Sequence, residues 1–390
     1  MPNQEIYPYR LFAPGPVPLS EGVRQALSEP MIHHRSESFQ HILGETLELL
    51  KGVFLTRQPV MLMSCAGSGA MEAAIVNSLS PGDEVLFINS GKFGERWLKM
   101  GKTFGLICRE LKVEWGKAVQ PETLRGALRV YPQLKAVFCQ ACETSTAVAH
   151  PIRELSEIIH EQSPSMLFVV DAMTAMGAMP LPMDDWRLDI VITGSQKAFM
   201  LPAGLAFIAF SERAWKAYEE SRLPKFYFDL GPERKANSNA ETRFSSGVSL
   251  IRALHFVLKN CFAGEGLERS IERSQNLARA TRESFLHYGW QIYSESPSSS
   301  VTAAWIPEAL RAKKIPSVLL KQFNLYVAGG QDELKGKIIR IGHLGYITDE
   351  DQDFFVKALG KVLEECQWPG VDSNKIELAV QNTQNILLKK

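Results

Sequence analysis

The sequence lacks an excess of charge of either sign. Its 390 residues include 43 Lys and Arg against 43 Asp and Glu, which gives a formal net charge of zero. A protein that gathers nucleic acid or an anionic membrane through a basic surface needs a surplus of Lys and Arg. The balance therefore argues against both kinds of partner.

Cysteines are few and long hydrophobic runs are absent. Six cysteines in a chain of this length are too sparse for a disulfide scaffold. No apolar run approaches the ~20 residues that cross a bilayer, and the first residues, MPNQEIYPYR, lack the apolar core of a signal peptide. We find no internal repeat and no low-complexity segment. These absences predict a cytoplasmic protein without a membrane partner.

What is present is an ordinary globular composition, with 45% hydrophobic and 22% charged residues. Short apolar runs alternate with helical patterns over the first two-thirds of the chain, which is typical of a mainly parallel sheet in an α/β fold. The predicted strands are 60–63, 85–88, 136–139, 167–170, 190–193 and 205–210.

The pattern changes after Gly247. A long helical stretch leads into shorter strands near 301–305, 325–327 and 338–341, and a last helix starts at Thr348, whose spacing to Asp351 is that of a capping box. We predict a large domain over 15–247, a smaller α+β domain from 1–14 and 248–367, and a polar surface extension over 368–390.

Two residues at strand ends carry the most informative signal. Asp171 ends the apolar run of LFVVDAMTAMG, and Lys197 follows the next run, in DIVITGSQKAF. Polar residues past the carboxyl ends of parallel strands lie where open α/β sheets bind ligands. A lysine amine opposite an acid is what pyridoxal 5′-phosphate requires, as a Schiff-base lysine and a partner for the ring nitrogen.

Neighbouring motifs strengthen this interpretation, although each has an ordinary structural explanation when taken alone. The turn in SCAGSGAMEAAI leads directly into a helix, whose free N–H groups can bind a phosphate. It is not a dinucleotide fingerprint, because the G-x-G-x-x-G spacing is absent. Phe93, in NSGKFGER, is an aromatic ring that can stack on a planar cofactor, and CQACETSTA brings hydroxyl groups to the same sheet edge.

Taken together, the motifs resemble the class V aminotransferases, in particular the alanine–glyoxylate and serine–glyoxylate (serine–pyruvate) branch. The likeness runs in order from about residue 11 to residue 365 through APGPVPLS, HHRSESF, AGSGAMEA, SGKFGER, ETSTA, VVDAMTAMG, TGSQKAF and IIRIGHLG. It implies fold type I of the pyridoxal-phosphate enzymes, with a large domain built on a seven-stranded, mainly parallel sheet and a smaller α+β domain. The implied activity transfers an amino group between alanine or serine and glyoxylate or pyruvate.

The resemblance also implies roles for individual residues. Lys197 would hold the cofactor and shuttle the substrate proton, Asp171 would pair with the ring nitrogen, and Arg340 with Gly15 would bind the substrate. The other implied cofactor contacts are Gly67, Ser68, Gly69, Phe93, Thr144 and Gln196, together with Thr242 and Ser245.

The last two would reach the cofactor phosphate of a partner subunit, which implies a homodimer with shared active sites. The chain departs from the family pattern here, since 242–247 read TRFSSG where a Tyr-containing turn with Thr-Pro is common. A second departure is Ala147, which follows ETST where glycine is usual.

Other features leave alternatives open. Cys139 and Cys142 form a C-x-x-C pair that is better explained by buried thiols than by a metal site, because no second pair accompanies it. The cluster 33–35, His-His-Arg, is either a loop before a helix or part of the substrate entrance, with Arg35 lining it.

A lyase or a cysteine desulfurase would use the same Lys and Asp. A desulfurase also needs a mobile nucleophilic cysteine, whereas Cys261 and Cys366 fall in helical patterns. A non-catalytic regulatory protein that keeps the fold is the alternative outside enzymes. Retention of Lys197, Asp171 and Arg340 argues against it.

Overall fold

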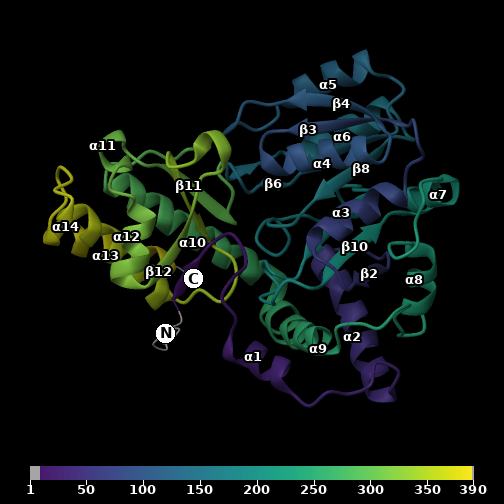
Figure 1. Ribbon diagram of the computed structural model, residues 1–390, viewed down its shortest axis with the longest axis horizontal. Coiled ribbons are helices and arrows are strands. Elements are labelled where there is room, and N and C mark those ends of the chain that lie inside the picture. The colour runs from purple at the N-terminus through teal and green to yellow at the C-terminus, as the bar shows by residue number, and fades with distance from the viewer. Residues whose placement is uncertain (1–8, 389–390) are drawn as a thin grey trace, which may run out of the picture.

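A computed structural model describes residues 9–388. Two separate sheets dominate it, one of seven strands and one of four (Figure 1). The large sheet has the order β2 (Val60–Met63), β10 (Ala206–Phe210), β9 (Ile190–Gly194), β8 (Leu167–Asp171), β5 (Ala136–Gln140), β3 (Glu84–Asn89), β4 (Ile107–Lys112).

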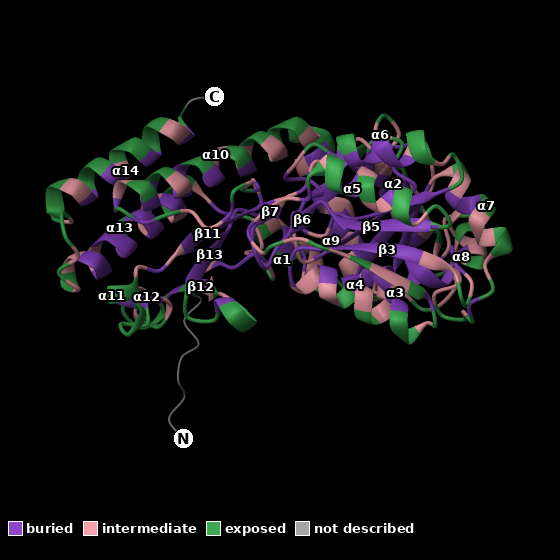
Figure 2. Ribbon diagram, turned by 90° about the horizontal axis from the view of Figure 1, so that it is seen from above, coloured by how far each residue is buried: buried purple, intermediate pink, exposed green. Residues whose placement is uncertain are grey.

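The large sheet is mainly parallel, as the sequence predicts. Only β10 runs antiparallel to its neighbours, β2 and β9. Apart from β4, its strands are buried on both faces, one set of side chains packing with Leu86, Val137 and Val170 and the other with Phe87 and Phe138. Burial on both faces is why these strands are continuous apolar runs and not alternating patterns (Figure 2).

The strand of the large sheet that the sequence does not reveal is β4. Its residues alternate between exposed and half-buried, and charged side chains such as Arg109 and Glu110 interrupt any apolar run. It lies at the edge of the sheet, paired only with β3, where charge protects an open strand from further pairing.

Helices cover both faces of the large sheet and connect its strands. They are α1 (Glu21–Ser28), α2 (Glu37–Phe54), α3 (Gly67–Val76), α4 (Lys92–Thr103), α5 (Pro121–Val130), α6 (Ile152–Gln162), α7 (Glu212–Glu220), α8 (Leu230–Asn237) and α9 (Val248–Val257). A small hairpin, β6 (Cys142–Glu143) with β7 (Val148–Ala149), follows the carboxyl end of β5.

The second sheet has the order β1 (Arg10–Phe12), β12 (Leu325–Gly329), β13 (Ile338–Gly342), β11 (Val301–Trp305). A π-helical segment (Leu258–Gly266) and α10 (Leu267–His287) lead into it from α9. Its remaining helical elements are α11 (Glu308–Arg311), α12 (Ile315–Phe323), a 3-10 turn (Asp332–Leu334), α13 (Asp349–Glu365) and α14 (Ser373–Leu387). The capping box expected at Thr348 is present, with Asp351 as its reciprocal partner.

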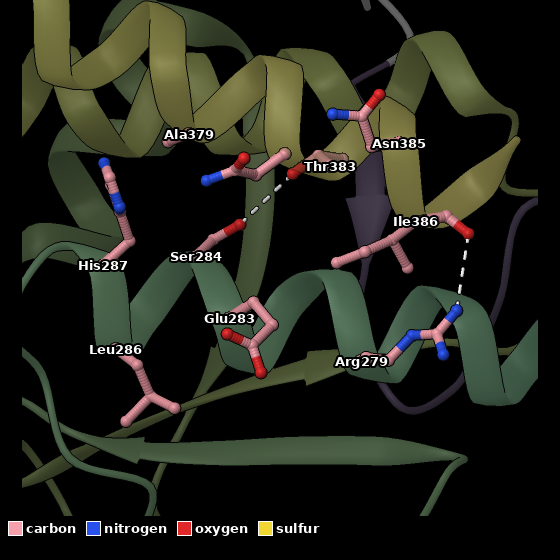
Figure 3. Close-up of a pocket in the computed structure, with 10 residues that line it drawn as sticks. Arg279, Glu283, Ser284, Leu286, His287, Ala379, Thr383, Asn385 and Ile386 are labelled. Atoms are coloured by element: carbon pink, nitrogen blue, oxygen red, sulfur yellow. Dashed lines mark hydrogen bonds between the residues drawn. The ribbon is translucent and has the colours of Figure 1, made fainter. Parts of the chain in front are cut away.

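The polar segment after residue 367 differs from the expected surface extension. Its residues 373–387 form α14, which buries Ile376, Ala379 and Leu387 in the same core as α13. Figure 3 shows α14 lying along α10, where Thr383 and Ser284 approach each other. The buried residues of α14 recur every third or fourth position, at Ile376, Ala379, Thr383 and Leu387, and one of them is a threonine, so the stripe does not stand out in a polar sequence. The predicted domain boundaries remain predictions.

Candidate active site

Lys197 lies just past the carboxyl end of β9. Its Nζ donates a hydrogen bond of 2.8 Å to the carbonyl oxygen of Pro14, which lies in the segment between β1 and α1. Burial lowers the pKa of Lys197 to about 8, while the charge of Asp171 opposes that shift. With this pKa the amine is still mostly protonated at neutral pH, but it loses its proton far more readily than an ordinary lysine, as a nucleophile or base must.

Asp171 is the last residue of β8 and is only 4% exposed. One carboxylate oxygen accepts a hydrogen bond from Trp97 Nε1 at 3.1 Å, and the other accepts from the backbone N–H of Met173 at 3.0 Å. Burial raises the pKa of Asp171, whereas these two hydrogen bonds lower it. Both donors favour the charged carboxylate, the form that pairs with a protonated ring nitrogen.

Trp97 is a site residue that the sequence analysis missed. It lies on α4, four residues after Phe93, so both aromatic side chains project from one face of the helix. The signal was available, because an aromatic residue one turn after the predicted stacking ring occupies the same face. Trp97 is fully buried, whereas Phe93 is half-buried with the guanidinium of Arg96 at 4.9 Å from its ring centre.

Gly67, Ser68 and Gly69 form the first turn of α3, immediately after β2. The residue before them, Ala66, offers no side-chain hydrogen bond, so the turn has N–H groups suited to an anion. Arg96 Nη1 donates to Ser68 Oγ at 3.3 Å, which brings a cation to the same turn.

Arg340 joins the second sheet to the turn between β6 and β7. It lies on β13, is 8% exposed, and donates to the carbonyl oxygens of Gly329 at 2.9 Å and Thr144 at 3.0 Å. The hydroxyl of Thr144 bonds to that of Thr174 at 2.8 Å. Burial lowers the pKa of Arg340, while the charge of Glu143 raises it.

Gly15 packs directly against the Lys197 side chain. Its φ is +143°, and a Cβ at this position would lie 2.4 Å from Lys197 Nζ. A side chain here would displace the amine, so the position requires glycine. Gly15 thus lies against Lys197, and the charges of two further predicted residues act on the same amine, since Asp171 raises the pKa of Lys197 and Arg340 lowers it.

Thr242 and Ser245 are not part of this group within one chain. Thr242 is buried and donates to the carbonyl oxygen of Phe244 at 2.8 Å, whereas Ser245 is exposed. Within residues 9–388, no hydrogen bond joins either side chain to Lys197 or Asp171. Their predicted contact with a partner subunit remains a prediction.

The remaining candidate features contribute little to the site. Cys139 and Cys142 are buried free thiols, and the part of the chain that the structure describes has no group of three or more potential metal ligands. Arg35 is paired with Glu241 at 3.4 Å. A cavity of about 510 Å³ between α10 and α14 (Figure 3) contains none of the predicted site residues.

The residues present fit pyridoxal phosphate. Gln196 Oε1 is buried and has no hydrogen-bond partner among the residues described, directly beside the lysine. The uncapped turn of α3 suits a phosphate, the Asp171 carboxylate suits a ring nitrogen, and the Lys197 amine has the lowered pKa that attack on an aldehyde requires. Among the helices of residues 9–388, none is long and apolar enough to span a membrane.

Comparison with known proteins places these residues in a family. The model of the family "Aminotransferase class-V" matches residues 21–331. The 42 kDa subunit of a soluble hydrogenase from Anabaena cylindrica is 38% identical, covering 91% of this chain and 93% of that protein. An L-aspartate–glyoxylate aminotransferase from Paracoccus denitrificans is 34% identical, covering 87% of each chain.

A solved structure gives the same result. The alanine–glyoxylate aminotransferase from Nostoc sp. superposes with a TM-score of 0.88 at 29% identity, covering 93% of this chain and 97% of that one. The family match favours the aminotransferase prediction over the lyase, desulfurase and non-catalytic alternatives. The chain belongs to the class V aminotransferases, a family of pyridoxal-phosphate-dependent enzymes.

Proposed function

We propose that the protein transfers an amino group between a small amino acid, alanine or serine, and a 2-oxo acid such as glyoxylate or pyruvate. The observation that carries the proposal is the grouping of Lys197, Asp171 and Arg340, in which the amine lies under the influence of both other charges. The relatives named as amino acid–glyoxylate aminotransferases support the choice of acceptor. The hydrogenase name of the Anabaena relative describes a different chemistry, which this grouping does not favour.

The bound cofactor would supply an electron sink for the charge that develops at the substrate α-carbon. Asp171 would keep the ring nitrogen protonated, because burial would leave the attraction between its carboxylate and that nitrogen little screened by solvent. Lys197 would remove the α-proton and return it as a general base and acid, a task that its pKa of about 8 suits.

Arg340 would hold the substrate carboxylate. A guanidinium has five N–H donors, of which two already bind the carbonyl oxygens of Gly329 and Thr144. These bonds fix the plane of the group and leave donors on both terminal nitrogens for a two-pronged ion pair. The substrate is thereby oriented with its α-proton toward Lys197, an alignment that accelerates proton transfer.

We infer that the enzyme works as a homodimer. Phe226 is 73% exposed and Tyr227 is 46% exposed, and the Tyr227 ring stacks on Phe244 at 5.0 Å. Exposed aromatic clusters of this kind commonly mark protein interfaces. Ser245 lies next to this cluster, so a partner that covers it would receive the 242–247 turn.

The proposal is tested by a half-reaction screen. Purified protein with added pyridoxal phosphate is mixed with single amino acids, and the visible absorption band of the bound cofactor is followed. We expect alanine and serine to bleach the band, and Lys197→Ala to show no such band. If only acidic or phosphorylated amino acids bleach it, the substrate assignment is wrong; if no band forms, the enzymatic proposal is wrong.

A further inference from the structure

Glu143 is a fully buried carboxylate that the proposed chemistry does not use. It lies on β6, at the start of the segment 143–146. In each hydrogen bond of its carboxylate, the partner is the donor and a carboxylate oxygen is the acceptor. A buried charge of this kind needs full satisfaction by hydrogen bonds to be tolerated.

One carboxylate oxygen of Glu143 holds the start of α4. It accepts hydrogen bonds from the backbone N–H groups of Phe93 at 3.0 Å and Gly94 at 3.1 Å. The other oxygen accepts from the N–H of Ser145 at 3.1 Å and from its hydroxyl at 2.5 Å. The same hydroxyl accepts from the N–H of Lys92 at 3.0 Å, so the first three N–H groups of α4 are all bound by this segment.

The approach between the two segments is close. A Cβ at Gly91, the residue before α4, would lie 2.4 Å from Ser145 Oγ and 2.6 Å from the carboxylate carbon of Glu143. The negative charge also lies at the positive end of the helix dipole, which strengthens the attachment. Helix α4 therefore starts at a position that one carboxylate fixes.

The position at which α4 starts determines where its aromatic side chains lie in the site. Phe93 is the second residue of the helix, and Trp97, one turn later, donates to Asp171. The carbonyl group of Thr144, next to Glu143 in the chain, accepts from Arg340. A shift of this segment would move the stacking ring, the donor to Asp171 and the substrate-binding guanidinium together.

We propose that Glu143 is a positioning residue of the active site, which sets the orientation of Phe93 and Trp97 toward the cofactor by binding the first turn of α4. The inference rests on the proposed function, because it assumes a cofactor whose ring would stack on Phe93 and whose ring nitrogen would pair with Asp171. Glu143 itself touches neither the cofactor nor the substrate in this assignment.

The test compares Glu143→Gln with Asp189→Asn as a matched control. Asp189 is also buried, at 1% exposure, and accepts hydrogen bonds from the N–H of Phe168 at 2.9 Å and the hydroxyl of Ser211 at 2.8 Å. It precedes β9 and so lies at the end of the sheet opposite to Lys197. Both variants keep the side-chain shape and replace one acceptor oxygen by an NH₂ group.

The first readout is the apo protein. We expect hydrogen exchange of the peptide 91–97 to be at least tenfold faster in Glu143→Gln than in the wild type, and unchanged in Asp189→Asn. The second readout is the holoenzyme. We expect the dissociation constant for pyridoxal phosphate to rise about tenfold, equivalent to about 1.4 kcal/mol, and the visible circular dichroism of the bound cofactor to fall at least twofold.

Should Glu143→Gln fail to fold, Ser145→Ala replaces it, since it removes one donor to the carboxylate and the acceptor for Lys92. We expect a smaller change in the same direction. Equal cofactor affinity and dichroism in Glu143→Gln and Asp189→Asn would overturn this inference alone. A wild-type protein that forms no visible band with the cofactor would overturn the proposed function and this inference together.

Discussion

The hydrogen bond from Trp97 to Asp171 offers a sharp test of the site's electrostatics. Substitution of Trp97 by Phe removes a donor 3.1 Å from a buried carboxylate and keeps an aromatic ring in contact with Phe138. A hydrogen bond to a charged group contributes about 1.5–3 kcal/mol. If that energy serves the reaction, kcat falls about ten- to a hundredfold.

The same change raises the pKa of Asp171, because the lost donor favours the charged form. Asp171 must be ionised to hold the ring nitrogen's proton, so the acidic limb of the kcat profile moves to higher pH. The assay is the steady-state rate measured over a range of pH, alongside thermal unfolding.

Trp290→Phe is the matched control. Trp290 is buried to 1% exposure and packs on Phe285, but its indole N–H has no hydrogen-bond partner in the described part of the chain. Both variants lose ring volume from a core and are expected to unfold at lower temperature. Only Trp97→Phe should change the pH profile; identical profiles in the two variants would refute the reasoning.

Two further predictions concern the lysine and its neighbour. The pKa of Lys197 falls from 10.5, its ordinary value, to about 8 in the folded protein. Burial of the protonated amine therefore lowers the stability of the apo protein by its full amount below pH 8, and this effect disappears above pH 10.5. Apo Lys197→Met should therefore be more stable than the wild type by up to about 3 kcal/mol at pH 7, measured by urea unfolding, and a pH-independent difference would contradict this. Gly15→Ala should lose at least tenfold in cofactor affinity, whereas Gly82→Ala, with φ +84° but open space around its Cβ, should retain it in the same binding titration. Equal affinities would show that the contact with Lys197 is unimportant.

The strands of the large sheet were predictable because they are buried on both faces and therefore read as apolar runs. The edge strand β4 was not, since its solvent-facing side chains break the run. Helix α14 was missed for a related reason: its buried residues are spaced among polar ones, and only packing on α10 and α13 selects the helix.

The site shows the same division. Lys197 and Asp171 could be proposed from the sequence because strand ends of a parallel sheet converge and because the motifs around them support a cofactor site. Their roles remain predictions. Glu143 was only part of a hydroxyl-bearing motif in the sequence, because its partners are backbone N–H groups about 50 residues away, which no side-chain pattern reveals. Ala147 has a φ of +59°, a left-handed backbone conformation that glycine adopts more easily than other residues. This explains why glycine is usual at this position in the family.

The central claim is that Lys197 binds the cofactor covalently. Reduction of the pyridoxal-phosphate-loaded protein with borohydride, followed by peptide mapping, measures which lysine carries the phosphopyridoxyl group. We predict a single modified peptide that contains Lys197. Stoichiometric labelling of another lysine, with Lys197 unmodified, would contradict the account.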